Sequence, residues 1–347
     1  MKISTFFRKY IFRILIILLM IGTLTYFFVR LQKSGNLSKA FTLFGSASIG
    51  FLILAFILMF VSLFLKAYRF YILLKPSSPN LKFGQFLLPF FVGYGFSTLG
   101  PLKTGEIASV EINKRTLSIP RSNTLAAIAF FRIFDLYVVI IFFIVALATT
   151  ITKIVNPDST LYLQIVFYIS LVGTIFLSFI FFFPPIGQFT LNIVQTIVGK
   201  FSERGEDWIK RVLQPALLEY YTSLKHLYTK KALALLVIVT TVVKWFLEFY
   251  SVKVTLIAFN SNISIIDAAA ISSVTLLVGI VTFVPAGLGT GTITTQTLLE
   301  GLQIPPSIVG ASIIYQTLIG TGLTLSAAAI SSFFIKDTKE LEEEEEV

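Results

Sequence analysis

Long apolar runs dominate this sequence and limit what the chain can fold into. They span residues 11–31, 43–71, 122–149, 162–184, 231–259 and 307–335. Each run exceeds the roughly 18 residues that mark a candidate transmembrane helix. Charged residues make up 13% of the chain, whereas soluble domains carry about a quarter. The sequence therefore predicts an all-α, polytopic helical membrane bundle with about six full transmembrane helices.

Two further apolar segments, 83–100 and 265–284, lead into the stretches GPLKTGE and VPAGLGTGT. Glycine and proline at this density interrupt a helix. Non-helical backbone at membrane depth is tolerated only where protein or a water-filled cavity covers it. We therefore expect two re-entrant segments whose tips meet near the membrane midplane. The alternative is a pair of tight turns at the membrane surface. A nucleotide-binding glycine loop is disfavoured because no strand pattern precedes either stretch.

The two broken segments belong to a weak internal repeat. Both copies contain the pattern P-x-x-x-G, formed by Pro101 with Gly105 and by Pro285 with Gly289. In each copy an Ile-Pro pair and a long apolar run follow. Repeat one covers about 43–150 and repeat two about 231–335. If the copies enter from opposite faces they form an inverted pseudo-repeat, and paired broken helices in such repeats point to a transport site.

The remaining segments complete a single integral membrane domain over residues 1–336. The polar block 187–230 has apolar positions at helical spacing, which predicts a cytoplasmic amphipathic hairpin against the membrane or the bundle. A solvated connector is the alternative. Residues 337–347 form an acidic run, and we expect a disordered tail there.

Basic residues outside the spans indicate the orientation. Most of them, including those at 66–82, fall on the side of the N-terminus. The opposite side carries Arg30, Lys33, Lys39 and Lys153. Because positive residues favour the cytoplasm, we expect a multi-pass protein of the cell membrane with both termini cytoplasmic. This topology and attraction to anionic lipids account for the net charge of +10, so no nucleic-acid partner is expected.

Residue types that several kinds of site require are absent from the sequence. There is no cysteine, which excludes disulfides and thiolate metal sites. The single histidine, His226, lies in the polar stretch HLYTKK and is expected at the surface. No nucleophile triad, metal cluster or paired carboxylates at a cleft can be assembled. We therefore expect no catalytic residue, no metal and no cofactor, and the chain is not expected to be an enzyme.

Four charged residues lie deep inside predicted spans. Arg132 and Asp135 are three apart, and Lys244 and Glu248 are four apart, so each pair shares a helix face. Arg132 lies roughly 15 Å from the helix start, near the centre of the bilayer core. A charge at this depth costs about 2.5–3.5 kcal/mol. In one interpretation, the cation and the carboxylate of each pair neutralise each other and only lock the bundle. In the other, the cations face a cavity and bind a lipid phosphate.

Several segments together resemble a known family over nearly the whole chain. They are KAYRFYILL, FLLPFFVGYGFSTLGPLKTGE, FFRIFDLY, VPAGLGTGT and GLQIPPSIVGASIIYQ. In order and spacing they resemble the transmembrane domain of lysylphosphatidylglycerol synthases, the flippase-like integral membrane family. The resemblance implies a helical bundle with re-entrant elements that moves lipids or lipid-linked precursors between leaflets. A soluble aminoacyl-transfer domain follows in the full-length synthases, and synthase activity is not expected here.

The resemblance also implies roles for particular residues. The family's basic-x-Gly-Glu pattern maps onto Lys103, Gly105 and Glu106, and its Arg-x-x-Asp pattern maps onto Arg132 and Asp135. Glu106 is read as a hairpin cap, with a proton carrier as the alternative.

Three positions depart from the family pattern. Phe131 and Thr292 stand where the family usually has glutamate, and Gln316 stands where it usually has arginine. The joint change at 292 and 316 suggests that a neutral hydrogen-bonding pair replaces a buried ion pair. The family's headgroup specificity is therefore not carried over to this chain.

These observations define an expected substrate-binding set. It comprises Arg132, Asp135, Lys103, Gly105, Glu106, Lys244, Glu248, Pro285, Gly287, Gly289, Thr292 and Gln316. We expect a lipid flippase or scramblase that moves an anionic phospholipid or a polyprenyl-phosphate-linked glycan through a groove between the two re-entrant hairpins. Membrane lipids are the expected partners, and a homo-oligomer or a partner glycosyltransferase is left open. Two alternatives remain: a non-transporting partner or regulator of a separate glycosyltransferase or lipid synthase, and a transporter of a small polar solute.

Overall fold

The computed structural model describes residues 37–99, 106–151, 157–281 and 290–335, together with positions 25 and 29. These ranges contain helices and connecting turns but no strand, which confirms the expected all-α class. The first apolar run apart from positions 25 and 29, the two glycine-rich breaks up to Gly105 and Gly289, and the acidic tail lie outside the described residues. Five helices in the described ranges are long and apolar enough to cross a membrane.

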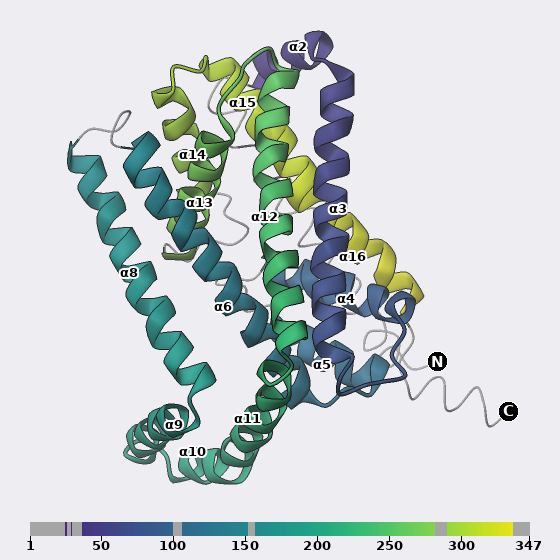
Figure 1. Ribbon diagram of the computed structural model, residues 1–347, viewed down its shortest axis with the longest axis vertical. Helices are drawn as coiled ribbons and strands as arrows, with labels where there is room; N and C mark the ends of the chain where they lie inside the picture. Colours follow the sequence, from purple (N-terminus) through teal and green to yellow (C-terminus); the bar gives the residue numbers. More distant parts are fainter. Residues whose placement is uncertain are drawn as a thin grey trace, which may run out of the picture.

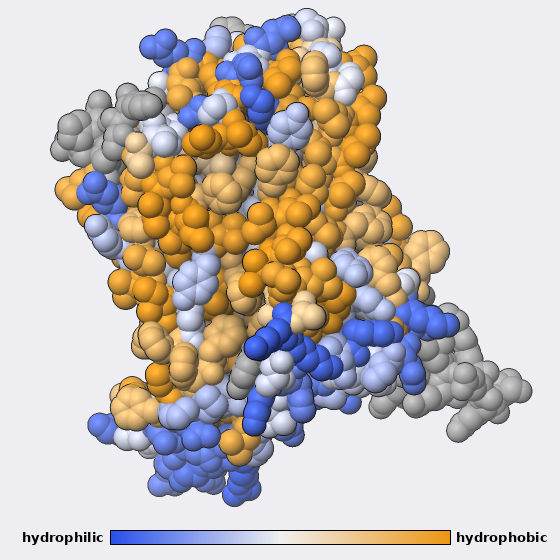
Figure 2. Space-filling model, viewed as in Figure 1, coloured by the Kyte–Doolittle hydropathy of each residue, from blue (hydrophilic) through white to orange (hydrophobic). Residues whose placement is uncertain are grey.

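The five long helices match five of the six predicted spans. They are α3 (Ile49–Leu74), α6 (Arg121–Ala146, extended by the π-turn η2, Leu147–Ile151), α8 (Pro157–Phe182), α12 (Lys231–Ala258), and α15 (Pro306–Thr317) continued through η5 (Leu318–Gly322) into α16 (Leu323–Phe334). Their outward side chains form a broad apolar belt between two polar ends (Figure 2). Exposed members of this belt include Ile49, Phe176 and Ile330. A chain with this surface needs a lipid environment.

Helices α3 and α12 pack side by side in opposite directions (Figure 1). The amide of Ser48, just before α3, donates to the carbonyl of Ala258 at the end of α12 over 2.9 Å. Near the other end, Arg69 of α3 donates to Thr241 of α12. The short helix α2 (Leu37–Ser46) precedes α3 and packs on α15. This antiparallel pair defines the two ends of the bundle.

Two helical hairpins start from opposite ends of that pair. Helix α4 (Phe83–Leu99) begins at the end where α3 stops, and it packs against α5 (Glu106–Leu117). Helix α13 (Ile265–Val281) begins at the end where α12 stops, and it packs against α14 (Thr290–Gly301). The connections inside both hairpins lie outside the described residues. The two hairpins therefore enter the bundle from opposite ends, which is the condition for an inverted pseudo-repeat.

A turn of the same geometry follows both hairpins. Ser118 and Gln303 have positive φ values of 54° and 62°. Each is followed by a buried isoleucine, and then by Pro120 (φ −55°, ψ 139°) or Pro305 (φ −55°, ψ 135°). Proline has no amide to donate and its φ suits a helix start, so α6 and α15 begin directly after it. The aligned sequence copies therefore share this backbone turn.

The polar block forms a chain of short helices at the end of the bundle that also holds α5 (Figure 1). Its elements are α9 (Pro184–Gly199), α10 (Glu203–Trp208), the π-turn η3 (Ile209–Leu213) and α11 (Gln214–Tyr228). The hydroxyls of Tyr220 and Tyr221 donate to the carbonyls of Phe181 and Ile180 at the end of α8. The block is thus attached to the bundle, as one of the two sequence readings predicted.

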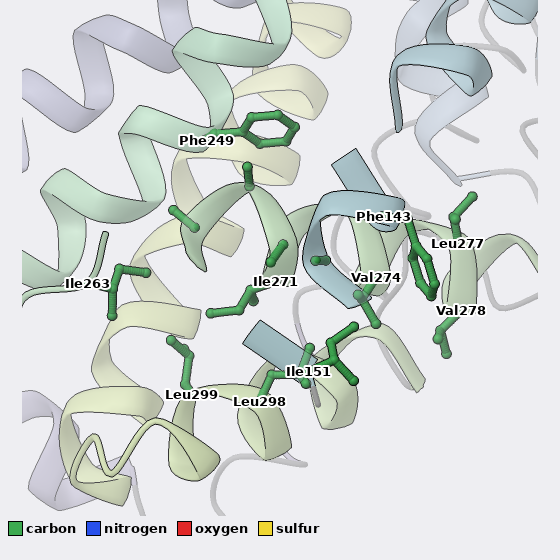
Figure 3. Packing of buried hydrophobic residues seen from close by; sticks show 14 of the residues in the cluster. Phe143, Ile151, Phe249, Ile263, Ile271, Val274, Leu277, Val278, Leu298 and Leu299 are labelled. Carbon is green, nitrogen blue, oxygen red and sulfur yellow. The ribbon is translucent and has the colours of Figure 1, made fainter. Parts of the chain in front are cut away.

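The apolar core has two main parts. One surrounds α13 and includes Phe143, Phe249, Ile271 and Val274 (Figure 3). The other surrounds Phe70 and draws on α3, α4, α6 and α11. Between these parts the helices do not close completely, and the charged residues meet in the space that they leave.

The contact between α4 and α16 depends on a glycine. A Cβ added at Gly95 would overlap the Cβ of Ala328, whereas a Cβ added at Gly84 on the same helix would meet nothing within 4 Å. We expect Gly95→Leu to destabilise the folded protein by about 1–3 kcal/mol through overpacking. Thermal unfolding of the purified protein in detergent measures this change, with Gly84→Leu as the matched control. Equal melting temperatures for the two variants would contradict this close contact.

Candidate functional site

A cavity of about 750 Å³ lies inside the bundle. Residues from α3, α4, α5, α6, α8, α12, α13, α14, α15, η5 and α16 line it, so both hairpins contribute. Most of the wall is apolar, and the charged groups gather on the side formed by α3, α5, α6 and α12. A largely apolar pocket with a few convergent polar groups is the usual form of a ligand site.

Every expected site residue within the described ranges lines this cavity. They are Glu106, Arg132, Asp135, Lys244, Glu248, Thr292 and Gln316. The remaining expected residues, Lys103, Gly105, Pro285, Gly287 and Gly289, lie outside the described residues. The structure therefore brings together charged residues from α5, α6 and α12. Their role as substrate ligands stays a prediction.

Asp135 on α6 is the centre of the charged network. The Arg69 guanidinium binds it with two parallel hydrogen bonds, Nη1 to Oδ1 over 2.9 Å and Nη2 to Oδ2 over 2.8 Å. Trp245 donates its indole N–H to Oδ1 over 3.0 Å, and the Lys244 Nζ lies 3.2 Å from the same oxygen. All of these side chains are buried. Because paired charges cost far less to bury than isolated ones, this arrangement allows a carboxylate to sit in the bundle interior.

Two more ion pairs face the cavity. The Lys66 Nζ lies 2.7 Å from Glu248, and the Ser62 hydroxyl donates to the same carboxylate oxygen over 2.7 Å. Arg132 pairs with Glu106 at the start of α5, and Glu106 also accepts a hydrogen bond from Ser97 over 3.2 Å.

Arg132 is the most exposed of the four cavity cations. Its side chain is 22% exposed, against 17% for Lys66 and 4% for Arg69 and for Lys244. The centre of the Phe131 ring lies 4.9 Å from the Arg69 guanidinium and 5.3 Å from the Arg132 guanidinium. Arg132 therefore presents the most exposed cationic side chain to the cavity, where an arginine can bind an anion.

The closest ion pairs differ from those that sequence spacing suggested. The distances between Arg132 and Asp135 and between Lys244 and Glu248 are 3.9 and 4.0 Å, longer than the contacts described above. The two carboxylates instead bind Arg69 and Lys66 most closely. Both pairs expected from spacing are therefore present, but each carboxylate also makes a shorter contact with a cation on another helix.

The sequence analysis did not identify Lys66 and Arg69 as site residues, because it counted them among the basic residues outside the spans. The span predicted at 43–71 ends near them, whereas α3 continues to Leu74 and turns both side chains inward. Their spacing of three, which places them on one helix face, is the signal that could have found them.

The neutral pair expected between Thr292 and Gln316 does not form. Gln316 donates instead to the Ser251 carbonyl and hydroxyl over 3.0 and 3.2 Å, and to the Thr255 hydroxyl over 2.6 Å. These bonds tie α15 to α12. No hydrogen bond joins Thr292 to Gln316 among the residues that the structure describes, and both side chains line the cavity separately.

Comparisons with known proteins cover both hairpins and the cavity. A family model for the lysylphosphatidylglycerol synthase TM region matches residues 10–327. The UPF0104 membrane protein MJ1595 of Methanocaldococcus jannaschii is 23% identical over 292 residues, which are 82% of this chain and 85% of that protein.

Proposed function

The chain belongs to the family of lysylphosphatidylglycerol synthase transmembrane regions, and we propose that it moves an anionic lipid between the leaflets of a membrane. The lipid is an anionic phospholipid or a polyprenyl-phosphate-linked glycan, and the protein acts on it as a flippase or scramblase without covalent chemistry. The observation that carries the proposal is a surplus of positive charge in an interior cavity with largely apolar walls.

The surplus comes from the charged side chains of the described cavity lining. Four of these side chains are cations and three are carboxylates: Lys66, Arg69, Arg132 and Lys244 against Glu106, Asp135 and Glu248. An unbalanced cation in the bundle interior is costly. An anionic headgroup entering the cavity would neutralise it. Arg132, the most accessible of these cations, has the planar fork that binds two phosphate oxygens at once.

The wall of the cavity also favours a lipid over a small solute. Leu177 of α8 lines the cavity, while the neighbouring Phe176 and Phe179 are exposed on the apolar surface. Leu177 is itself among the exposed apolar side chains, so the cavity wall and the outer apolar surface meet along this helix. Acyl chains could remain among apolar side chains while the headgroup occupies the charged part, which a small polar solute would not require.

The two hairpins supply the route in this proposal. They approach the cavity from opposite ends of the bundle, and both contribute lining residues, such as Glu106 and Thr292. In transporters built from inverted repeats, such paired segments expose a central site to one side and then to the other. We assign the end with α5 and α9–α11 to the cytoplasm of a cell membrane. This end still holds most of the basic residues outside the helices of the bundle, even when Lys66 and Arg69 are counted as part of the bundle interior.

A leaflet-exchange assay tests the proposal. Purified protein in liposomes is supplied with fluorescent phosphatidylglycerol or fluorescent phosphatidylcholine, and the fraction accessible to an impermeant quencher is followed over time. We expect protein-dependent exchange that is faster for phosphatidylglycerol. Liposomes without protein are the control. Absence of exchange for phosphatidylglycerol and for a polyprenyl phosphosugar, with and without a pH gradient, would contradict transport and favour the regulator of a separate enzyme.

A further inference from the structure

The cavity has two chemically different halves. The half formed by α3, α5, α6 and α12 carries the ion pairs. The half formed by α13, α14, α15, η5 and α16 presents hydroxyl groups and no charged side chain among its described lining residues. Six hydroxyl residues of this second half, called here the hydroxyl half, are Ser272, Thr275, Thr292, Thr295, Thr317 and Thr321.

The hydroxyl half still has hydrogen-bonding capacity for a ligand. Ser272 donates to the Ala268 carbonyl over 2.8 Å, which leaves the lone pairs of its oxygen for a donor from the cavity. Thr275 and Thr295 bond to each other over 2.8 Å and join α13 to α14. One of these two hydroxyls donates to the other, so the hydrogen of the second hydroxyl and lone pairs on both oxygens are left for a further partner. That partner can come from the cavity.

Three threonines of the hydroxyl half form fewer hydrogen bonds with the described residues. Thr292, Thr317 and Thr321 are half-buried, and no hydrogen bond joins their hydroxyls to other described residues. A neutral polar group in an apolar-walled cavity is stabilised when it gains a hydrogen-bond partner. A ligand with several hydroxyl groups would both donate to and accept from these side chains.

The charged half does not suit a cationic group of the ligand. Each of its three described carboxylates already binds a cation: Glu106 binds Arg132, Asp135 binds Arg69, and Glu248 binds Lys66. An ammonium group in the headgroup would have to displace one of these partners. A phosphodiester needs no such exchange, because the cations exceed the carboxylates.

We propose that the cavity selects a lipid headgroup in which one phosphodiester is joined to a neutral polyol or sugar. The phosphate occupies the charged half near Arg132, and the hydroxyl groups of the ligand occupy the hydroxyl half. This inference rests on the lipid site of the proposed function, and it excludes headgroups whose second part is an ammonium. A glycerophospholipid with a glycerol headgroup and a polyprenyl phosphosugar share this chemistry.

Binding of matched short-chain lipids to the full-length protein in detergent tests the proposal. Dihexanoyl phosphatidylglycerol and dihexanoyl phosphatidylmethanol carry the same charge, but the second has a methyl group in place of glycerol. We expect phosphatidylglycerol to bind about tenfold more tightly, as one or two net hydrogen bonds would provide. Dihexanoyl phosphatidylethanolamine is expected to bind more weakly than either. A further pair, citronellyl phosphomannose and methyl citronellyl phosphate, shows whether the sugar source is preferred over the glycerol source.

Threonine-to-valine variants link the preference to the hydroxyl half. Thr292→Val and Thr321→Val keep the side-chain shape and remove the hydroxyl. Each is expected to lower the affinity for phosphatidylglycerol several-fold more than the affinity for phosphatidylmethanol. The matched control is Thr297→Val on α14, because Thr297 is exposed and donates to its own helix at the Ile293 carbonyl.

The possible failures of the two proposals are distinguishable. Equal binding of phosphatidylglycerol and phosphatidylmethanol, or tighter binding of phosphatidylethanolamine, overturns the headgroup inference even if leaflet exchange occurs. Equal losses for both anionic lipids in the valine variants also overturn it. A retained preference without any leaflet exchange supports the headgroup inference and overturns transport.

Discussion

Arg132→Ala is expected to slow leaflet exchange of phosphatidylglycerol by at least about tenfold. A charge-assisted hydrogen bond contributes about 1.5–3 kcal/mol, and 1.36 kcal/mol corresponds to a factor of ten in rate. The side chain of Arg132 is the most accessible of the cavity cations, and the substitution removes at least one such bond to a phosphate. The protein should remain folded because Arg132 borders the cavity instead of the close-packed core. The proteoliposome assay measures the rate, and detergent melting measures the fold.

Three further variants separate charge from geometry at this position. Arg132→Lys keeps the charge without the planar fork and is expected to show an intermediate rate. Arg211→Ala removes an exposed arginine from the η3 turn and should leave exchange unchanged. The double variant Arg132→Ala with Glu106→Gln removes the carboxylate that the single variant leaves without its arginine. Recovery of wild-type exchange in the double variant would show that Arg132 serves to neutralise Glu106, and unchanged exchange in Arg132→Ala would remove it from the mechanism.

Asp135→Ala is expected to destabilise the protein by about 3–5 kcal/mol, because it leaves buried cations without their counter-charge. Arg69 would lose both of its hydrogen bonds to the carboxylate, and Trp245 would lose its acceptor. Thermal unfolding in detergent and the yield of folded protein measure this effect. The matched control is Asp207→Ala, since Asp207 is exposed and its contact with Arg211 is 3.5 Å long, so no measurable change is expected there.

A double substitution keeps this prediction testable if the single variant fails to fold. Asp135→Leu combined with Arg69→Met replaces both members of the pair with apolar side chains. Replacement of both partners is usually far less harmful than removal of one. We expect the double variant to melt at a higher temperature than Asp135→Leu alone, although Lys244 still limits the recovery. If Asp135→Ala melts like the wild type, the network does not stabilise the fold.

Hydropathy and turn chemistry predicted much of the architecture. Five spans were located within a few residues, because a helix in lipid must be apolar along its whole length and this property is local to the sequence. The Ile-Pro pairs at 119–120 and 304–305 marked two turns of the same backbone geometry. The described residues expected at a site, from Glu106 to Gln316, do line one cavity.

The partners of those residues could not be read from the sequence. Spacing along a helix paired Arg132 with Asp135, whereas the close partner of Asp135 is Arg69, 66 positions away on α3. The pair expected between Thr292 and Gln316 failed for the same reason, since Gln316 finds its acceptors on α12. Spacing describes neighbours on one helix, but a buried side chain bonds to whatever the adjacent helix presents.

The sequence by itself determined the membrane class, five of the spans and the presence of charges that require partners. Lipid as a solvent imposes these features on each segment separately. The tertiary structure alone decided which cation binds which carboxylate and which hydroxyls face the cavity. Serine and threonine in a membrane helix commonly bond to their own backbone, as Thr297 does on α14, and the residue type is the same when the side chain lines a site. Only the packing of α13, α14 and η5 around the cavity distinguishes Thr292 and Thr321 from such residues.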